Sequence, residues 1–310
     1  MLNHASIRHC WIGRLRRSIA PALALLGIGC ALAGDPAPVP APAPDAKGFA
    51  ATNAVLAATK EQPFTNSLGM VFVPVRGSKA LFCIWETRVR DFRAFVKDTG
   101  HKATNDVYSL RSDGWKQRGD TWESPGFYQT ETNPVCAVNW EDATKFCEWL
   151  SRKESRKYRL PTDLEWSGAV GLAYRELGKT PKERDREVFG IYPWGEHFPP
   201  SPDYGNYAGL EARNLDWPEK AGTIDGFRDQ HPRTSPVGSY PANIFGLYDV
   251  GGNVWEWCQD WYDGEQKYRV MRGASWFSDD TRSTQSGSRY RYAPTMRNTG
   301  IGFRVVLETE

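Results

Sequence analysis

The chain has few of the residues and patterns that mark several common protein classes. Its 310 residues include only five histidines and six cysteines, without the His/Cys spacing of a zinc site. No repeat of solenoid length and no nucleophile-elbow motif occur. The formal net charge is only +2, and four arginines lie within residues 1–33, so the rest has no basic excess. These shortages disfavour zinc domains, repeat proteins, α/β-hydrolases and nucleic-acid-binding proteins.

Long apolar runs are scarce as well, and the one that stands out covers residues 19–33. It follows a basic stretch that ends at Arg17 and closes with the small-x-small pattern Ala31-Leu32-Ala33. The run is shorter than the roughly 20 residues that a membrane span needs. We therefore expect residues 1–33 to be a cleaved export signal, with Gly34 as the first mature residue.

Two other interpretations of this N-terminus stay open. The run can act as an uncleaved anchor, or Cys30 can carry a lipid, although Gly27 stands where a lipid-modified cysteine usually has a large aliphatic residue. We expect no membrane contact other than through such an anchor or lipid. In each case the body of the protein is exported, to the periplasm or the extracellular space.

Alternating prolines follow the apolar run. In residues 35–45 proline alternates mostly with alanine, which favours an extended polyproline II segment over a helix or a central strand. Residues 46–62 show little apolar periodicity. We therefore assign residues 34–62 to a linker and residues 63–310 to a single domain.

The composition of the body points to a fold built largely from loops. Aromatic residues make up 13% of the chain, with 13 Trp, beside 29 Gly and 21 Pro.

The residue pattern predicts three helices, over about 88–98, 140–152 and 163–170. The first is expected to be capped by Thr87 and to end at Gly100, and the third is expected to begin with a Thr162/Glu165 capping box. Strands are expected near 70–74, 81–85, 269–272 and 302–307. Residues 192–269 read as one long loop, which needs special stabilisation. The prediction is an α+β domain with little regular secondary structure.

Five motifs occur in a fixed order along this body. They are Arg159-Leu-Pro-Thr-Asp-Leu-Glu-Trp166, Tyr192-Pro-Trp-Gly195, Gly246-Leu-Tyr-Asp-Val-Gly-Gly-Asn-Val-Trp-Glu-Trp257, Arg272-Gly-Ala-Ser-Trp276 and Gly302-Phe-Arg304. Together they resemble the formylglycine-generating enzyme family, also called the sulfatase-modifying factor domain, over about residues 64–308. The resemblance implies a C-type-lectin-like fold.

Oxygen-bearing residues in the long loop suggest two calcium sites. Asp249 and Glu256 flank a glycine-rich turn, and calcium prefers carboxylate and carbonyl oxygens. The family resemblance implies that Gly252 and Val254 add their backbone carbonyls. It also implies a second site from the side chains of Asn206 and Asp225 with the carbonyls of two further residues, Tyr207 and Phe227. Two ordinary Asx turns are the alternative at this second place.

This sequence lacks the two cysteines that bind copper in the family it resembles. Its enzymes convert a substrate cysteine to formylglycine with Cu(I) held by two cysteines, and the resemblance places Ser278 and Ser283 at those positions. No cysteine follows Cys258. Because Cu(I) prefers thiolates, we expect no copper and no copper-dependent formylglycine generation.

The family's substrate cleft leaves a set of matching residues, which we call the groove set. It consists of Trp255, Ser275, Trp276, Ser278, Ser283 and Arg289. None is assigned a catalytic role. Alternation in 289–294 puts Arg289 and Arg291 on one strand face, either to bind an anionic or aromatic ligand or, as we favour, to satisfy internal carboxylates and carbonyls.

The remaining cysteines of the mature chain are Cys83, Cys136, Cys147 and Cys258. Export permits disulfides, and four cysteines allow three complete pairings. Cys147 matches a disulfide cysteine of the family, but Val305 stands at the partner position. Since Cys147 also lies on the apolar face of its helix, a buried free thiol is favoured there.

Three classes of function fit these patterns. The first, which we favour, is an exported, calcium-stabilised binding or scaffold domain for a peptide, protein or small ligand. The second is a periplasmic maturation enzyme of the same family with a non-copper mechanism. The third is a variable receptor made by a diversity-generating retroelement, with variation near residues 276–300.

Overall fold

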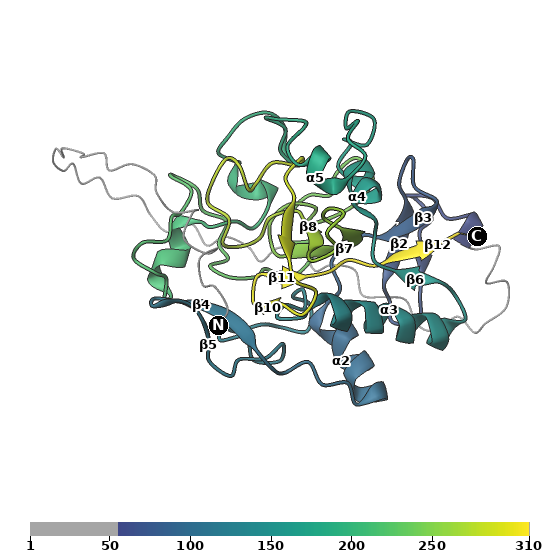
Figure 1. The fold of residues 1–310 in the computed structure, drawn as a ribbon, viewed down its shortest axis with the longest axis horizontal. Helices are drawn as coiled ribbons and strands as arrows, with labels where there is room; N and C mark the ends of the chain where they lie inside the picture. Colours follow the sequence, from purple (N-terminus) through teal and green to yellow (C-terminus); the bar gives the residue numbers. More distant parts are fainter. Residues whose placement is uncertain (1–54, 310) are drawn as a thin grey trace, which may run out of the picture. The chain divides into compact units, whose positions relative to one another are not determined.

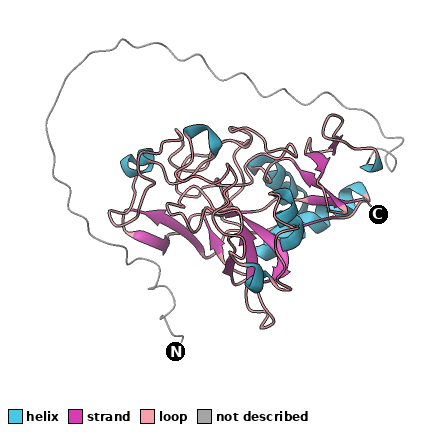
Figure 2. Ribbon diagram, turned by 90° about the horizontal axis from the view of Figure 1, so that it is seen from above, coloured by secondary structure: helices cyan, strands magenta, loops and turns pink. Residues whose placement is uncertain are grey.

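The computed structural model describes residues 55–309, so the expected export signal, Cys30 and residues 35–45 lie outside it. Within residues 55–309 no helix is both long and apolar enough to cross a membrane. The described chain is mixed α and β, with loops between short elements (Figure 2). Residues 55–62, which we assigned to the linker, pack on the domain: Val55 is buried, and Lys60 Nζ donates to the carbonyl of Ile244.

The first sheet joins the two ends of the domain. It contains β1 (Phe64–Thr65), β2 (Val71–Pro74), β3 (Ala80–Cys83), β12 (Val306–Glu308) and β6 (Tyr158–Arg159), in that spatial order and antiparallel throughout. β12 lies between β3 and β6, as Figure 1 shows, with Val306 opposite Phe82. The last strand of the chain thus completes a sheet that begins near the N-terminus of the domain.

Two helices bury their apolar faces against each other and against this core. They are α2 (Val89–Thr99) and α3 (Trp140–Glu154). Phe92 and Phe146 stack with centroids 6.2 Å apart, and Phe303 packs edge-on against both. These rings account for much of the aromatic excess in the sequence, since buried rings supply large apolar area.

The helix termini follow the predicted chemistry with one correction. Gly100 ends α2 in the left-handed conformation, at φ 68°, and the Thr162/Glu165 capping box starts α4 (Asp163–Ala169), both as predicted. The N-cap of α2, however, is Arg88 and not Thr87. The Asp91 carboxylate accepts both the backbone N–H and the Nε–H of Arg88, so the first turn is satisfied without a threonine hydroxyl.

Two further sheets and short helices complete the domain. One sheet has the order β10 (Arg297–Asn298), β4 (Val107–Arg111) and β5 (Gly114–Gln117); the other has β11 (Ile301–Gly302), β7 (Trp255–Trp261), β8 (Arg269–Arg272) and β9 (Tyr290–Tyr292). The short helices are α5 (Pro181–Arg184), η1 (Pro202–Tyr204) and η2 (Leu210–Asn214). The predicted strand over 302–307 was therefore wrong as one strand. Its ends belong to different sheets, because the chain crosses between them at Phe303–Val305.

The long predicted loop needs one correction as well. Residues 192–254 contain no strand, but 255–261 form β7, an inner strand between β11 and β8. Trp255, Trp257 and Cys258 are all buried there, since both faces of the strand are covered. The alternating tryptophans of this stretch are typical of a strand, and the glycines just before it obscured that pattern.

Candidate metal and ligand sites

A buried carboxylate cluster lies where β7 meets the crossing at residue 304. Glu86, Asp249 and Glu256 are all buried, with Glu86 and Glu256 fully so. Arg304 Nη2 donates to Glu256 Oε1 at 2.7 Å, and Trp166 Nε1 donates to Glu256 Oε2 at 3.1 Å. The guanidinium of Arg304 therefore balances one carboxylate of the three.

Glu86, which sequence reasoning missed, faces the turn that contains the predicted ligands. Its carboxylate accepts the backbone N–H of Val254 at 3.1 Å and the side-chain N–H of Asn253 at 2.8 Å. Burial, with the nearby charges of Asp249 and Glu256, raises the pKa of Glu86 well above its ordinary range. Glu86 lies three residues after the end of β3, and only its burial beside the other acids distinguishes it from a solvated glutamate.

Asp249 fits the role of a cation ligand. Its Oδ2 accepts the backbone N–H of Gly238 at 2.7 Å, whereas its Oδ1 is buried and has no hydrogen-bond partner in residues 55–309. Burial raises the pKa of Asp249 to about 6. A buried carboxylate oxygen without a partner is the kind of donor that a hard cation takes, but no group of three His, Cys, Asp or Glu residues in 55–309 is arranged to hold a metal ion. The predicted Glu256 is also in the cluster, but Arg304 already binds its carboxylate.

The residues of the second predicted calcium site lie on two segments, around 206–210 and 224–227, that are hydrogen-bonded to each other. The carbonyl of Phe227 accepts the N–H of Leu210, and the carbonyl of Ala208 accepts the N–H of Ile224. The side-chain oxygen of Asn206 is buried without a partner in the described chain, which fits a ligand role. Asp225 is exposed, and none of the hydrogen bonds in residues 55–309 joins it to Asn206.

A different carboxyl group is buried beside this second set. Asp229 Oδ2 accepts the backbone N–H of Tyr207 at 2.7 Å, and Glu211 Oε1 accepts the backbone N–H of Asp229 at 2.8 Å. Burial, reinforced by the side chain of Glu211, raises the pKa of Asp229 to about 9. Sequence reasoning missed Asp229 and Glu211, because two acids in a polar loop read as solvated residues.

Most of the groove set lies below the surface. Ser275 and Trp276 are fully buried, and Trp255, Ser278 and Arg289 are nearly so. Ser278 Oγ accepts the backbone N–H of Ser275 at 3.1 Å, and Ser283 Oγ donates to the Asp280 carboxylate at 3.1 Å. The rings that surround Trp276 belong to Trp115, Phe127, Trp217 and Phe277. The chain's own aromatic side chains thus fill the space around Trp276.

Arg289 takes part in an internal network, as the favoured interpretation predicted. Its Nε donates to Asp163 Oδ1 at 3.0 Å, and its Nη1 donates to Glu176 Oε1 at 2.6 Å. The interpretation does not hold for Arg291, which is exposed and lies over the ring of Tyr262. The rings of Tyr290 and Tyr292 lie 5.3 Å apart, but Tyr290 is exposed.

The four cysteines of the body do not offer copper a thiolate pair. Cys83, Cys136, Cys147 and Cys258 are buried, and none forms a disulfide within the described residues, which confirms the free thiol expected at Cys147. Burial raises the pKa of Cys83 to about 11 and also raises the pKa of the other three. Protonated, enclosed thiols are poor ligands for Cu(I). The donor set of residues 55–309 therefore does not fit the copper centre that the resemblance implies.

Comparison with known proteins supports the family. A family model described as the sulfatase-modifying factor enzyme 1-like domain matches residues 78–309. The chain is 29% identical over 280 residues to the formylglycine-generating enzyme of Streptomyces coelicolor, covering 74% of this chain and 79% of that one. It is 30% identical over 250 residues to a Bos taurus protein named inactive C-alpha-formylglycine-generating enzyme 2, covering 69% and 72%.

A solved structure supports the fold. PvdO from Pseudomonas aeruginosa has a TM-score of 0.57 and 23% identity, covering 79% of this chain and 97% of PvdO. At that identity the likeness concerns the fold. Because the family model spans most of the chain, from β3 to β12, this protein belongs to the family of sulfatase-modifying factor enzyme 1-like domains.

Proposed function

We propose that this protein is an exported, calcium-stabilised binding domain without copper-dependent formylglycine-generating activity. The observation that carries the proposal is the pair Ser278 and Ser283 at the positions where the family resemblance requires cysteines. Its ligand is a peptide or another molecule presented at a surface. Export rests on the signal-like residues 1–33, and calcium rests on the unpartnered oxygens of Asp249 and Asn206.

The two serine hydroxyls are unsuited to Cu(I) for reasons of both chemistry and local structure. A hydroxyl is a hard oxygen donor that stays protonated near neutral pH, whereas Cu(I) prefers thiolates. Ser278 Oγ and Ser283 Oγ are also engaged in turns, with Ser275 and Asp280 respectively. The Bos taurus relative that is named inactive, at 30% identity, is consistent with loss of activity in a member of this family.

The assay is the mass of a cysteine-containing sulfatase peptide after incubation with the protein, Cu(I), air and reductant. We expect the peptide mass to stay unchanged. The informative companion is the double variant Ser278→Cys with Ser283→Cys, assayed for Cu(I) binding by competition with a chromogenic chelator. Copper binding by the double variant and not by the wild type would support the assignment of these positions. Formation of formylglycine by the wild type would refute the proposal.

A further inference from the structure

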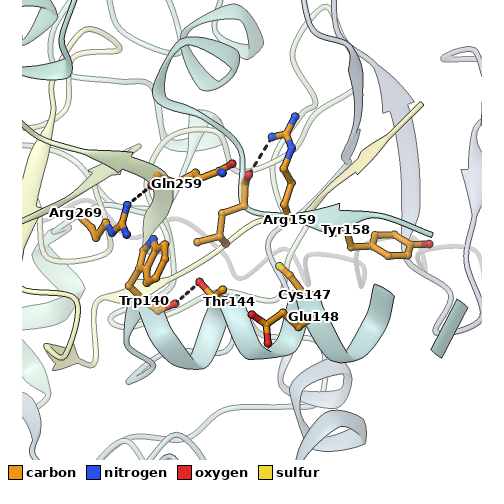
Figure 3. A pocket seen from close by; sticks show the side chains of 9 residues that line it. Trp140, Thr144, Cys147, Glu148, Tyr158, Arg159, Gln259 and Arg269 are labelled. Atoms are coloured by element: carbon orange, nitrogen blue, oxygen red, sulfur yellow. Dashed lines mark hydrogen bonds between the residues drawn. The ribbon is translucent and has the colours of Figure 1, made fainter. Parts of the chain in front are cut away.

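A pocket outside all the predicted sites lies between α3, β6 and the β7–β8 hairpin. Its volume is about 290 Å³. It is lined by Trp140, Thr144, Cys147, Glu148, Tyr158, Arg159, Leu160, Gln259 and Arg269 (Figure 3). None of these residues belongs to the groove set or to the calcium sets. The pocket is therefore a separate candidate for ligand binding.

The size and walls of the pocket suit a small molecule with an apolar body. Cys147, Tyr158 and Leu160 are buried and give it an apolar interior, next to the indole of Trp140. An apolar cavity of about 150 Å³ holds benzene, and ligand pockets usually exceed about 300 Å³. This pocket thus has room for more than a single ring, but it is too small for a folded partner.

Arg269 is held at the Trp140 end of the pocket in a fixed orientation. Its guanidinium carbon lies 3.8 Å from the ring centroid of Trp140 and 3.5 Å from that of Trp261. One of its nitrogens, Nη1, donates to the Gln259 carbonyl at 2.6 Å, an interaction drawn in Figure 3. Because two indoles cover the faces of the guanidinium, only its edge is left for a ligand.

That edge has no partner in the described chain. Nε of Arg269 is enclosed by the protein and has no hydrogen-bond acceptor in residues 55–309, whereas Nη2 is accessible and donates no hydrogen bond there either. Arg269 forms no ion pair within residues 55–309, and the carboxylate whose charge acts on it, with burial opposing, is Asp260. Nη2 belongs to a permanently charged guanidinium, and its N–H groups can donate a charge-assisted hydrogen bond to a carboxylate oxygen.

The other charged groups of the pocket determine at which end a bound anion lies. Arg159 is already paired, with Glu165 and Glu308, both at 2.7 Å. Glu148 is exposed and makes no hydrogen bond to the described residues. It follows Trp140 by two turns of α3, roughly 12 Å along the helix axis. A bound anion is therefore attracted to the Arg269 end and repelled from the Glu148 end.

We propose that this pocket binds a small apolar carboxylate. The carboxylate accepts from the accessible Nη2 of Arg269, and the apolar body lies along Trp140, Cys147 and Leu160. A free monocarboxylic acid and the apolar C-terminus of a peptide share this chemistry. The site is independent of the calcium sets and of Ser278 and Ser283.

The test is isothermal titration calorimetry of the folded protein with two probes, decanoate and N-acetyl-leucyl-leucine. Each is paired with its neutral primary amide. We expect at least one carboxylate to bind, at least tenfold more tightly than its amide. Arg269→Gln should weaken carboxylate binding at least tenfold, whereas Arg291→Gln, which removes an exposed arginine stacked on Tyr262, should leave it unchanged.

A second variant tests the pocket without replacing Arg269, in case Arg269→Gln prevents the protein from folding. Thr144→Phe fills the pocket one helical turn from Trp140, at the loss of the hydrogen bond from Thr144 Oγ1 to the Trp140 carbonyl, and should abolish binding of both probes with an unchanged circular dichroism spectrum. Binding of decanoate alone, or of the peptide alone, identifies the source of the ligand and supports the proposal. Equal binding of acid and amide, binding unaffected by either variant, or no binding of either probe to the wild type would overturn it.

Discussion

At the residue scale, one buried carboxylate, that of Asp163, accepts hydrogen bonds from three arginines. Asp163, the first residue of α4, accepts hydrogen bonds from Arg272 Nη1 at 2.6 Å and from Arg289 and Arg184 at 3.0 Å. These arginines come from three segments that are distant from one another in the sequence. The carboxylate thus joins β8, α5 and the residue that precedes β9 to α4.

Replacing this carboxylate should be costly. Asp163→Asn removes the charge that balances buried guanidinium groups, and breaking a buried pair costs roughly 3–5 kcal/mol. Urea denaturation measures the free energy of unfolding. The control is Asp113→Asn, whose exposed carboxylate pairs with Lys116 and Arg118 and should contribute far less. Similar losses in the two variants would contradict the structural role of Asp163.

The same residue makes a specific contribution to acid stability. Burial alone would raise the pKa of Asp163, but Arg272, Arg289 and Arg184 overcome it and lower the pKa from 3.8 to about 2. Because the pKa is lower in the folded state, the stabilisation is fully present above about pH 4 and is lost as the pH falls towards 2. Its size is roughly 2 kcal/mol.

This contribution can be isolated by comparing two proteins over the same pH range. The free energy of unfolding should fall more steeply for the wild type than for Asp163→Asn between pH 5 and pH 2, so that the difference between the two curves narrows by roughly 2 kcal/mol. All other carboxylates are shared and cancel in the difference. A gap that stays constant over this range would show that Asp163 does not titrate as described.

At the element scale, the left-handed backbone conformation of Gly100 determines where α2 ends. Gly100 ends α2 with φ 68°, and its backbone N–H donates to the carbonyl of Val96. A methyl group there would have open space around it, so the only cost of Gly100→Ala is conformational. We expect a loss of roughly 1–2 kcal/mol of unfolding free energy.

A second glycine provides the matched control for that substitution. Gly264 also has open space for a methyl group, but its φ lies outside the left-handed region. Gly264→Ala should therefore change the unfolding free energy by less than about 1 kcal/mol, and in the stabilising direction. Thermal denaturation of both variants measures the difference. If the two behaved alike, the αL conformation would not be what ends α2.

Prediction of elements from sequence succeeded where local chemistry decides the structure. The capping box of α4, the glycine at the end of α2 and the amphipathic face of α3 are all local, and each was predicted correctly. Thr87 was wrong as a cap, since the competing Arg88–Asp91 pair makes its contacts one residue later. The strand over 302–307 was wrong because only tertiary structure shows that its two halves join different sheets.

At the scale of the whole molecule, the backbone of the stretch 192–254 is held by hydrogen bonds of loops and short helices, because it contains no strand. Calcium that binds the folded state would stabilise it by mass action. We expect chelation to lower the melting temperature by several degrees, and Asp249→Ala to lower it further than the exposed control Glu219→Ala when calcium is present. Differential scanning fluorimetry provides the measurement.

The cation-free protein gives the sharper comparison. In chelator, the penalty of Asp249→Ala relative to Glu219→Ala should shrink, because removing one carboxylate relieves repulsion with Glu86 and Glu256. A penalty of equal size with and without calcium would assign Asp249 a purely structural role through its hydrogen bond to Gly238. A melting temperature unaffected by chelator would remove both calcium sites from the proposal.

The sequence by itself determined the family, the α+β class rich in loops, and the absence of a thiolate pair at 278 and 283. Ordered motifs and single residue identities carry these conclusions, and neither depends on how the chain folds back on itself. The predicted ligands Asp249 and Asn206 were also identified in this way, and their unpartnered oxygens suit that role.

Only the tertiary structure decided which charges meet. Glu86 joins Asp249 and Glu256 across more than 150 residues, Arg304 binds Glu256, and Arg269 lies between Trp140 and Trp261. The energy of a buried charge depends on its distance to other charges and on exclusion of water, and neither quantity is local in sequence. For the same reason the burial of Ser275 and Trp276, and the pocket beside α3, could not be predicted from the sequence.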